Sequence, residues 1–286
     1  MKRPISNQPR HLETGAGLPL LMVPGMEGSR WFWRYQLEEL GGQYRAIACD
    51  LARRSPSLAS TVADYAAEVL SLMDELALER AVLVGESFGG VVVQHLALAH
   101  PDRVLALVLC NTLDRPRPGG FGVNLFTLAT LAHFGAVLAP GLTRAQRKRA
   151  LDWVGRHRGF VMDPSPGNAA LADHILDYGT ACGAAAYADR LIAGLKVRHT
   201  ERLGQIRAPT LVLSGSEDRV VLADTADELR RRIPGAELVV IQGGGHCCPH
   251  TLPRETNAAI GAWLQRQDLS MKRPRVEPHA AARPRA

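Results

Sequence analysis

The chain has 286 residues, of which 46% are hydrophobic, and its formal net charge at pH 7 is +6. This length and composition predict a soluble globular protein with a sizeable core. No apolar run reaches the roughly 18 to 20 residues that a membrane span requires, and the first residues lack the apolar segment of a secretory signal. We therefore expect a cytoplasmic protein with no membrane span.

The positive charge lies at the two ends of the chain. Lys2, Arg3 and Arg10 account for the first ten residues, and residues 271–286 carry a net charge of +4. Residues 11–270 then have a net charge of −1. The basic ends are typical of solvated tails rather than of a nucleic-acid-binding surface, so we expect no nucleic-acid partner.

The cysteines do not form the pattern of a disulfide framework. Their number is odd and their spacing is irregular, which is typical of free thiols in a reducing compartment. We therefore expect no disulfides. The five residues are Cys49, Cys110, Cys182, Cys247 and Cys248.

Short aliphatic runs predict the strands of one sheet. They are apolar throughout rather than at alternate positions, as in strands that helices cover on both faces. Helical segments separate them, which indicates βαβ units and mainly parallel strands. The fold class is therefore α/β, with a doubly wound sheet. The predicted strands are residues 18–23, 45–49, 81–84, 104–109, 210–213 and 237–241.

The strand pattern stops between residues 114 and 204, where the sequence becomes helical and irregular. We interpret this region as an inserted helical cap, because compact domains rarely contain so long a structureless loop. Within it, residues 144–154 and 169–178 have helical spacing, and residues 125–138 are apolar. The predicted organisation is a flexible N-terminus at 1–13, a core formed by 14–113 and 205–267, the cap at 114–204, and a disordered basic tail at 268–286.

The segment Gly85-Glu86-Ser87-Phe88-Gly89 follows a predicted strand and opens a predicted helix. In such a strand–turn–helix, the serine takes strained backbone angles that expose its hydroxyl, and a Cβ at either glycine would collide across the turn. The G-x-S-x-G pattern alone arises by chance in roughly one chain of this length in ten. Its setting between a strand and a helix identifies Ser87 as a candidate nucleophile.

A serine hydroxyl needs a base to take its proton, and the base needs an acid to orient it. His246 follows the predicted strand 237–241 after three glycines, and Asp218 follows the predicted strand 210–213. Both therefore lie at the carboxyl edge of the sheet, and we predict a Ser87, Asp218, His246 triad. Glu217 and Asp114 are rival acids. Asp218 could instead cap the helix that follows it.

These motifs give the chain a resemblance to the α/β-hydrolase superfamily from Glu13 to Gln267. The resemblance implies that backbone N–H groups of Phe88 and Met26 hold the oxyanion. Many members carry His-Gly where this chain has Pro24-Gly25. The residues before the first predicted strand have room for a short strand or two, so the sheet is expected to have fewer than the family's eight strands.

Several other groups have a structural explanation. The aromatic cluster at residues 31–35 is expected to pack a helix onto the sheet rather than to line a pocket. Glu86 is interpreted as a structural polar group. The segment 246–250 contains two histidines and two cysteines, but neighbouring residues converge poorly on one ion, so no metal site is predicted. The glycines form no nucleotide-binding motif, and no cofactor is expected.

The function predicted from these residues is hydrolysis of a small-molecule carboxylic ester through an acyl-enzyme on Ser87. Since one triad serves many substrates, a thioester or a carbon–carbon bond beside a ketone is an alternative. A non-catalytic binding protein on the same fold is a second alternative. The cap is expected to select the substrate.

Overall fold

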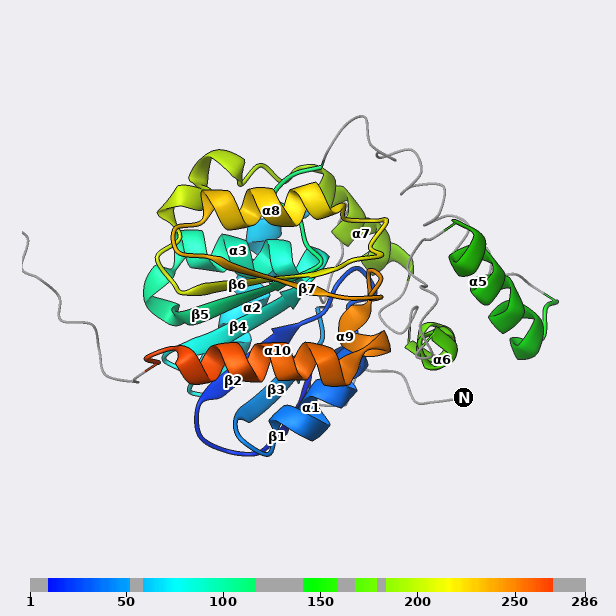
Figure 1. Ribbon diagram of the computed structural model, residues 1–286, viewed down its shortest axis with the longest axis horizontal. Coiled ribbons are helices and arrows are strands. Elements are labelled where there is room, and N and C mark those ends of the chain that lie inside the picture. The colour runs from blue at the N-terminus through cyan, green and yellow to red at the C-terminus, as the bar shows by residue number, and fades with distance from the viewer. Residues whose placement is uncertain (1–9, 52–58, 117–140, 159–167, 179–183, 270–286) are drawn as a thin grey trace, which may run out of the picture.

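The computed structural model describes residues 10–51, 59–116, 141–158, 168–178 and 184–269. Its centre is a seven-stranded sheet in the order β1-β3-β2-β4-β5-β6-β7, in which only β1 is antiparallel to its neighbour. Helices cover both faces (Figure 1). The α/β prediction with a doubly wound sheet is therefore confirmed. The strands are β1 His11–Thr14, β2 Pro19–Val23, β3 Arg45–Cys49, β4 Ala81–Glu86, β5 Val104–Cys110, β6 Thr210–Gly215 and β7 Glu237–Ile241.

The first strand begins inside the segment that was predicted to be flexible. β1 pairs with β3, so that His11 lies opposite Cys49 and Thr14 opposite Ala46. Residues 11–13 therefore belong to the sheet, so the predicted flexible segment 1–13 extends too far along the chain. Its other residues, 1–9, lie outside the described residues, as does the predicted tail beyond Leu269.

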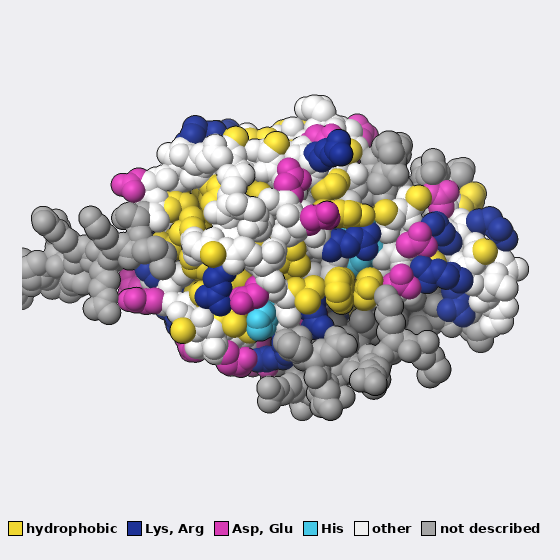
Figure 2. Space-filling view, turned by 90° about the horizontal axis from the view of Figure 1, so that it is seen from below, with side chains coloured by type: hydrophobic (Ala, Val, Ile, Leu, Met, Phe, Trp, Pro, Cys, Tyr) yellow, Lys and Arg dark blue, Asp and Glu magenta, His cyan; other side chains and the backbone are white. Residues whose placement is uncertain are grey.

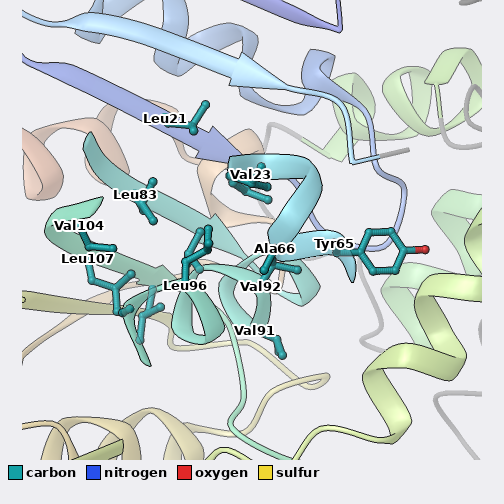
Figure 3. Packing of buried hydrophobic residues seen from close by; sticks show 14 of the residues in the cluster. Leu21, Val23, Tyr65, Ala66, Leu83, Val91, Val92, Leu96, Val104 and Leu107 are labelled. Carbon is teal, nitrogen blue, oxygen red and sulfur yellow. The ribbon is translucent and has the colours of Figure 1, made fainter. Parts of the chain in front are cut away.

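Four strands, β2, β4, β5 and β6, are buried on both of their faces because helices lie against both sides of the sheet. The edge strand β7 is partly exposed. In β2, Leu21 and Val23 point to one cluster, and Leu20 and Met22 point to the other. The first cluster, part of which is drawn in Figure 3, packs against α2 Val62–Glu75, α3 Phe88–Ala99 and α8 Ala223–Arg232. The second packs against α1 Arg34–Leu40 and α10 Pro253–Arg266.

This burial is the main source of stability for the sheet. All four of these β2 side chains are 0% exposed, and burying one large apolar side chain contributes about 1.5 to 3 kcal/mol. The core holds the strand ends rigidly. Side chains that follow the strands at the carboxyl edge are therefore placed with little freedom.

In the described part of the segment between β5 and β6, three α-helices are present: α5 Arg144–Arg158, α6 Asn168–Tyr178 and α7 Ala184–Leu195. They lie beyond the carboxyl ends of the strands (Figure 1). α6 packs against η2 Arg30–Trp33 and α9 Cys248–Thr251, and α7 packs against α3. The predicted apolar stretch 125–138 lies outside the described residues.

Ion pairs join two of the inserted helices. Arg144 of α5 lies 2.7 Å from Asp177 of α6, and Lys148 lies 2.6 Å from Asp173. Figure 2 shows basic and acidic side chains next to each other at this end of the molecule. Each of these side chains is more than a third exposed, so each pair contributes at most about 1 kcal/mol.

The remaining described elements are two short helices, η3 Pro101–Arg103 and η4 Thr200–Gln205. η3 leads directly into β5, and η4 leads back from the insertion toward β6. Across the described ranges, we find no helix that is long and apolar enough to cross a membrane.

Candidate active site

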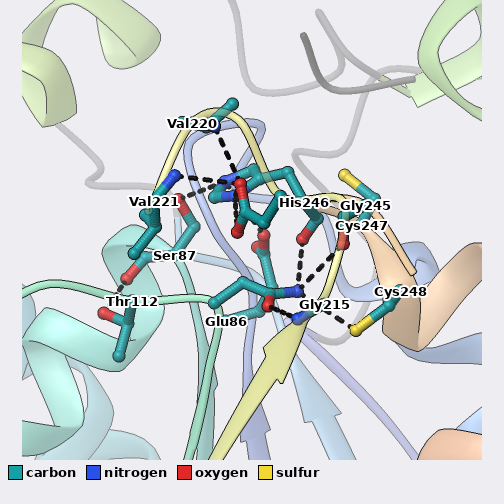
Figure 4. Close-up of polar contacts among 12 residues, drawn as sticks. Glu86, Ser87, Thr112, Gly215, Val220, Val221, Gly245, His246, Cys247 and Cys248 are labelled. Atoms are coloured by element: carbon teal, nitrogen blue, oxygen red, sulfur yellow. Dashed lines mark hydrogen bonds and ion pairs between the residues drawn. The ribbon is translucent and has the colours of Figure 1, made fainter. Parts of the chain in front are cut away.

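Ser87 occupies a sharp turn between β4 and α3. Its φ is 50°, a left-handed conformation that costs energy for a residue with a side chain. Two hydrogen bonds hold this turn: the Ser87 N–H donates to the Cys110 carbonyl at 3.0 Å, and the Thr112 hydroxyl donates to the Ser87 carbonyl at 2.6 Å (Figure 4). Residues at and just after the end of β5 therefore hold the Ser87 backbone, and neither bond uses the serine hydroxyl.

The two glycines of the motif are required for different reasons. A Cβ at Gly85 would lie 2.5 Å from the Gly89 carbonyl oxygen, which is the collision across the turn that the sequence predicts. A Cβ at Gly89 would instead lie 2.2 Å from the Val23 carbonyl oxygen at the end of β2. Gly89 was predicted to be needed because a Cβ would collide across the turn. This reason was wrong, because the atom that the Cβ would meet belongs to β2.

Replacing Gly85 with alanine is expected to destabilise the protein by about 2 to 3 kcal/mol or more, because the colliding atoms belong to the backbone and cannot rotate away. The matched control is Gly261→Ala on α10, where an added Cβ meets nothing within 4 Å. That change should stabilise the helix by about 0.5 to 1 kcal/mol. Denaturant unfolding of both variants measures the difference, and equal effects would contradict this account of the turn.

His246 lies between Ser87 and Asp218. Its Nε2 is 3.0 Å from the Ser87 Oγ, and its Nδ1 is 3.0 Å from Oδ2 and 3.2 Å from Oδ1 of Asp218. His246 and Asp218 are both buried. In the neutral imidazole, Nδ1–H donates to the carboxylate, which leaves the Nε2 lone pair to accept the serine proton. The structure thus brings together all three residues of the predicted triad.

The rival acids lie elsewhere. Glu217 is exposed, and the carboxylate of Asp114 pairs with Thr200 and Arg115. Asp218 does not cap α8, since the N-cap residue is Leu222. Its Oδ1 accepts the N–H groups of residues 220 and 221, at 2.8 and 2.9 Å. This second set of bonds holds the loop after β6 in place.

Asn111 joins the loops that carry the histidine and the acid, and the sequence analysis missed it. Its Nδ2 donates to the His246 carbonyl at 2.7 Å, and its Oδ1 accepts the Gly215 N–H at 2.8 Å. The loops also touch directly, because a Cβ at Gly215 would lie 2.2 Å from the Gly244 carbonyl oxygen. A polar residue directly after the buried β5 was the available signal.

The charges around the imidazole favour its protonated form. Burial opposes the charge, but the negative charge and hydrogen bond of Asp218 outweigh it, and with a contribution from Glu86 they raise the pKa of His246 to about 9. Glu86 is itself buried, with Oε1 3.5 Å from the His246 Nε2. Desolvation raises the pKa of Glu86 to about 8, although the charge of His246 lowers it.

The two predicted oxyanion donors stand on different elements. Phe88 is the first residue of α3, so its N–H has no acceptor within the helix. Met26 belongs to the β2–η2 loop, residues 24–29. The guanidinium of Arg190 on α7 donates to the carbonyls of Met26 at 2.8 Å, Glu27 at 3.2 Å and Leu51 at 2.7 Å. This anchor from α7 was also missed by the sequence analysis.

The aromatic cluster after this loop both packs the core and faces the insertion. Phe32 and Trp33 are buried, as expected for a cluster that packs η2 onto the sheet. Trp31, in contrast, stacks on Tyr178 of α6, with ring centroids 5.6 Å apart. His250 belongs to the segment 246–250, for which no metal site was predicted. Its ring packs against the Phe32 ring, with the two centroids 5.8 Å apart. Within the described segments, no group of three His, Cys, Asp or Glu residues is placed to hold a metal ion.

A serine hydroxyl hydrogen-bonded to a buried imidazole at the carboxyl edge of a parallel sheet is typical of enzymes that use serine as a nucleophile. The chain belongs to the alpha/beta hydrolase fold family, whose model matches residues 19–251. The resemblance drawn from the sequence is therefore confirmed, and hydrolase activity is supported for this chain.

Named relatives and solved structures agree with this family. The chain is 31% identical to the "Putative carbamate hydrolase RutD" of Caulobacter sp. strain K31 over 84% of this chain and 88% of that protein. The "Putative carbamate hydrolase RutD" of Pantoea ananatis is 28% identical over 87% of this chain and 88% of that protein. A thermophilic esterase from Thermogutta terrifontis superposes with a TM-score of 0.71 at 26% identity, covering 89% of this chain and 92% of that chain.

Proposed function

We propose that the chain is a serine hydrolase that cleaves a small-molecule carboxylic ester through an acyl-enzyme on Ser87. One observation carries this proposal: the continuous hydrogen-bonded series from the Ser87 Oγ through His246 to the Asp218 carboxylate. Its three members follow three different strands, β4, β6 and β7, and this placement supports the orientation that nucleophilic catalysis needs. The likeness to a solved esterase at 26% identity supports the same chemistry.

In the proposed reaction, the His246 Nε2 takes the hydroxyl proton while the Ser87 Oγ attacks the ester carbonyl carbon. The N–H groups of Phe88 and Met26 donate to the resulting oxyanion. His246 then gives the proton to the leaving alkoxide as the C–O bond breaks. A water molecule attacks the acyl carbon and gives a proton to His246, which returns it to Ser87 as the acid leaves. No cofactor or metal enters these steps.

Residues 114–204 are assigned the role of a cap that selects the substrate. Two of its helices contact the β2–η2 loop: the Nε2 of His174 on α6 lies 2.7 Å from the Glu27 Oε1, and the Arg190 Nε on α7 donates to the Met26 carbonyl. These contacts support the assignment, because they bring the insertion next to the proposed oxyanion donors. The pocket shape that follows would set the size of the acyl and leaving groups.

A second candidate is a carbamate, and the relatives named RutD favour it. Like an ester, a carbamate has a carbonyl carbon that the Ser87 Oγ can attack. Its nitrogen donates electron density to that carbon, so the attack is slower. A substrate panel separates the candidates. It should contain p-nitrophenyl esters of increasing acyl length, alkyl carbamates, an acyl thioester and a β-diketone, so that the carbon–carbon alternative is included.

The direct test uses a fluorophosphonate probe, followed by mass mapping of the labelled peptide. We expect the probe to label Ser87 and labelling to disappear in Ser87→Ala. The matched control is Ser71→Ala, at an exposed serine of α2, which should be labelled like the wild type. Labelling of another residue would overturn the assignment of the nucleophile. No labelling at all would favour the non-catalytic binding protein.

A further inference from the structure

Glu86 joins two parts of the site that the proposed mechanism uses separately. The residue is 3% exposed, and its Oε1 lies 3.5 Å from the His246 Nε2, the nitrogen that also contacts the Ser87 Oγ. The backbone N–H of Gly25 donates to the same carboxylate. Figure 4 shows Glu86 just below Ser87 and His246. One side chain therefore contacts both the base and the β2–η2 loop.

The fit between Glu86 and Gly25 is close. A Cβ at Gly25 would lie 2.2 Å from the Glu86 Oε2 and 3.1 Å from the Ser87 Cβ. The glycine of the Pro24-Gly25 pair is thus required by the carboxylate beside it. Met26, the proposed oxyanion donor, is the next residue along the chain. The bond between Gly25 and Glu86 therefore holds the loop on one side of Met26, while Arg190 holds the Met26 carbonyl itself.

We propose that Glu86 is a positioning residue that holds the β2–η2 loop through Gly25 and whose negative charge, 3.5 Å from the His246 Nε2, stabilises the imidazolium form of that base. This inference rests on the proposed roles of Ser87 and His246. It extends the interpretation of Glu86 as a structural polar group. It also predicts a behaviour that a merely structural carboxylate would not have, namely control over the pH at which the base becomes available.

The groups around Glu86 determine whether its carboxyl is protonated or anionic, and therefore whether it stabilises the imidazolium of His246. Burial favours protonated Glu86, and the negative charges of Glu27 and Asp218 add to this effect, while His246 and the Gly25 N–H favour the anion. The thiols of Cys110 on β5 and Cys248 on α9 also face it, and the charge of Glu86 helps to raise both of their pKa values. Buried neutral thiols contribute no charge of their own, so His246 is the group that an anionic Glu86 affects most.

The pH dependence follows from the two pKa values. Desolvation raises the pKa of Glu86 to about 8, and the negative charges of Asp218 and Glu86 raise the pKa of His246 to about 9 against the effect of burial. Catalysis requires neutral His246, so the activity of the wild type should rise with pH toward 9. Without the Glu86 charge, the pKa of His246 should fall, and the acidic limb of the profile should move to lower pH.

The experiment compares the wild type with Glu86→Gln and Glu86→Ala. The rate of Ser87 labelling by a fluorophosphonate is measured from pH 5 to 10, and the imidazole of His246 is titrated by NMR. We expect both variants to move the acidic limb and the His246 titration down by about one pH unit. Glutamine can still accept the Gly25 N–H, whereas alanine cannot, so only Glu86→Ala should also lower the plateau rate, by about tenfold.

Each outcome bears on a different claim. Glu38→Gln, at an exposed glutamate of α1, should leave the profile unchanged. An unshifted limb in Glu86→Gln, with Ser87 labelled normally in the wild type, would overturn the inference and leave the proposed function in place. A wild type in which Ser87 is not labelled at any pH would overturn both. If Glu86→Ala does not fold, the near-isosteric glutamine variant still decides the question.

Discussion

Replacing Ser87 with alanine is expected to lower kcat/KM for ester hydrolysis by at least about four orders of magnitude. The change removes the oxygen that forms the acyl-enzyme and leaves the proposed oxyanion donors in place. The measurement is the steady-state hydrolysis of short p-nitrophenyl esters at a pH where the wild type is fully active. A loss smaller than about tenfold would exclude Ser87 as the nucleophile.

The same variant should fold normally, which makes the loss interpretable. The Ser87 backbone bonds to the Cys110 carbonyl and the Thr112 hydroxyl do not involve the side-chain oxygen. Alanine therefore keeps the turn, at a similar cost for its left-handed backbone. The free energy of unfolding should change by less than about 1 kcal/mol. A much larger change would assign part of the activity loss to misfolding.

Replacing Asp218 with asparagine is expected to lower kcat by about three to four orders of magnitude. The amide can donate a hydrogen bond to the His246 Nδ1, which favours the tautomer whose Nε2 already carries a proton and cannot accept one from Ser87. The Asn Oδ1 can still accept the N–H groups of residues 220 and 221, so the loop should stay in place. The measurement is kcat with the best ester of the substrate panel.

Glu217→Gln is the matched control for this change. It removes one carboxylate charge from the adjacent position, but Glu217 is exposed and lies outside the contacts of His246. We expect less than about a twofold effect on kcat, because a screened surface charge acts weakly on a buried site. Equal losses in the two variants would contradict the assignment of Asp218 as the orienting acid.

Most of the sheet was predictable because the signal for a buried strand is local. The six predicted strands are apolar runs, and the core covers both faces of most of them, while β7 is partly exposed. β4 differs from its prediction only by including Gly85 and Glu86 at its end. β1, with the sequence His-Leu-Glu-Thr and a partly exposed surface, has no such run. Only its pairing with β3 makes it a strand, and a distant pairing leaves no local pattern.

The residues around the candidate site were predictable only where a motif or chain order marked them. Ser87, Asp218 and His246 follow strand ends in an order that indicates their chemistry. Arg190 lies 164 positions from Met26, and nothing near it in the sequence specifies that its guanidinium binds backbone carbonyls. Asn111 and Glu86 were visible as polar residues at strand ends, but their partners come from other loops. Their roles therefore required the three-dimensional arrangement.

The three carbonyl bonds of Arg190 have a consequence for exchanging parts between relatives. The insertion and the β2–η2 loop share one buried guanidinium, so a chimera that receives another protein's insertion without an arginine at this position would leave the carbonyls of Met26, Glu27 and Leu51 without this donor. Each lost bond to a charged donor costs about 1.5 to 3 kcal/mol. The insertion is therefore not an independent structural unit, and a successful graft must keep Arg190 of α7 together with the loop that it binds.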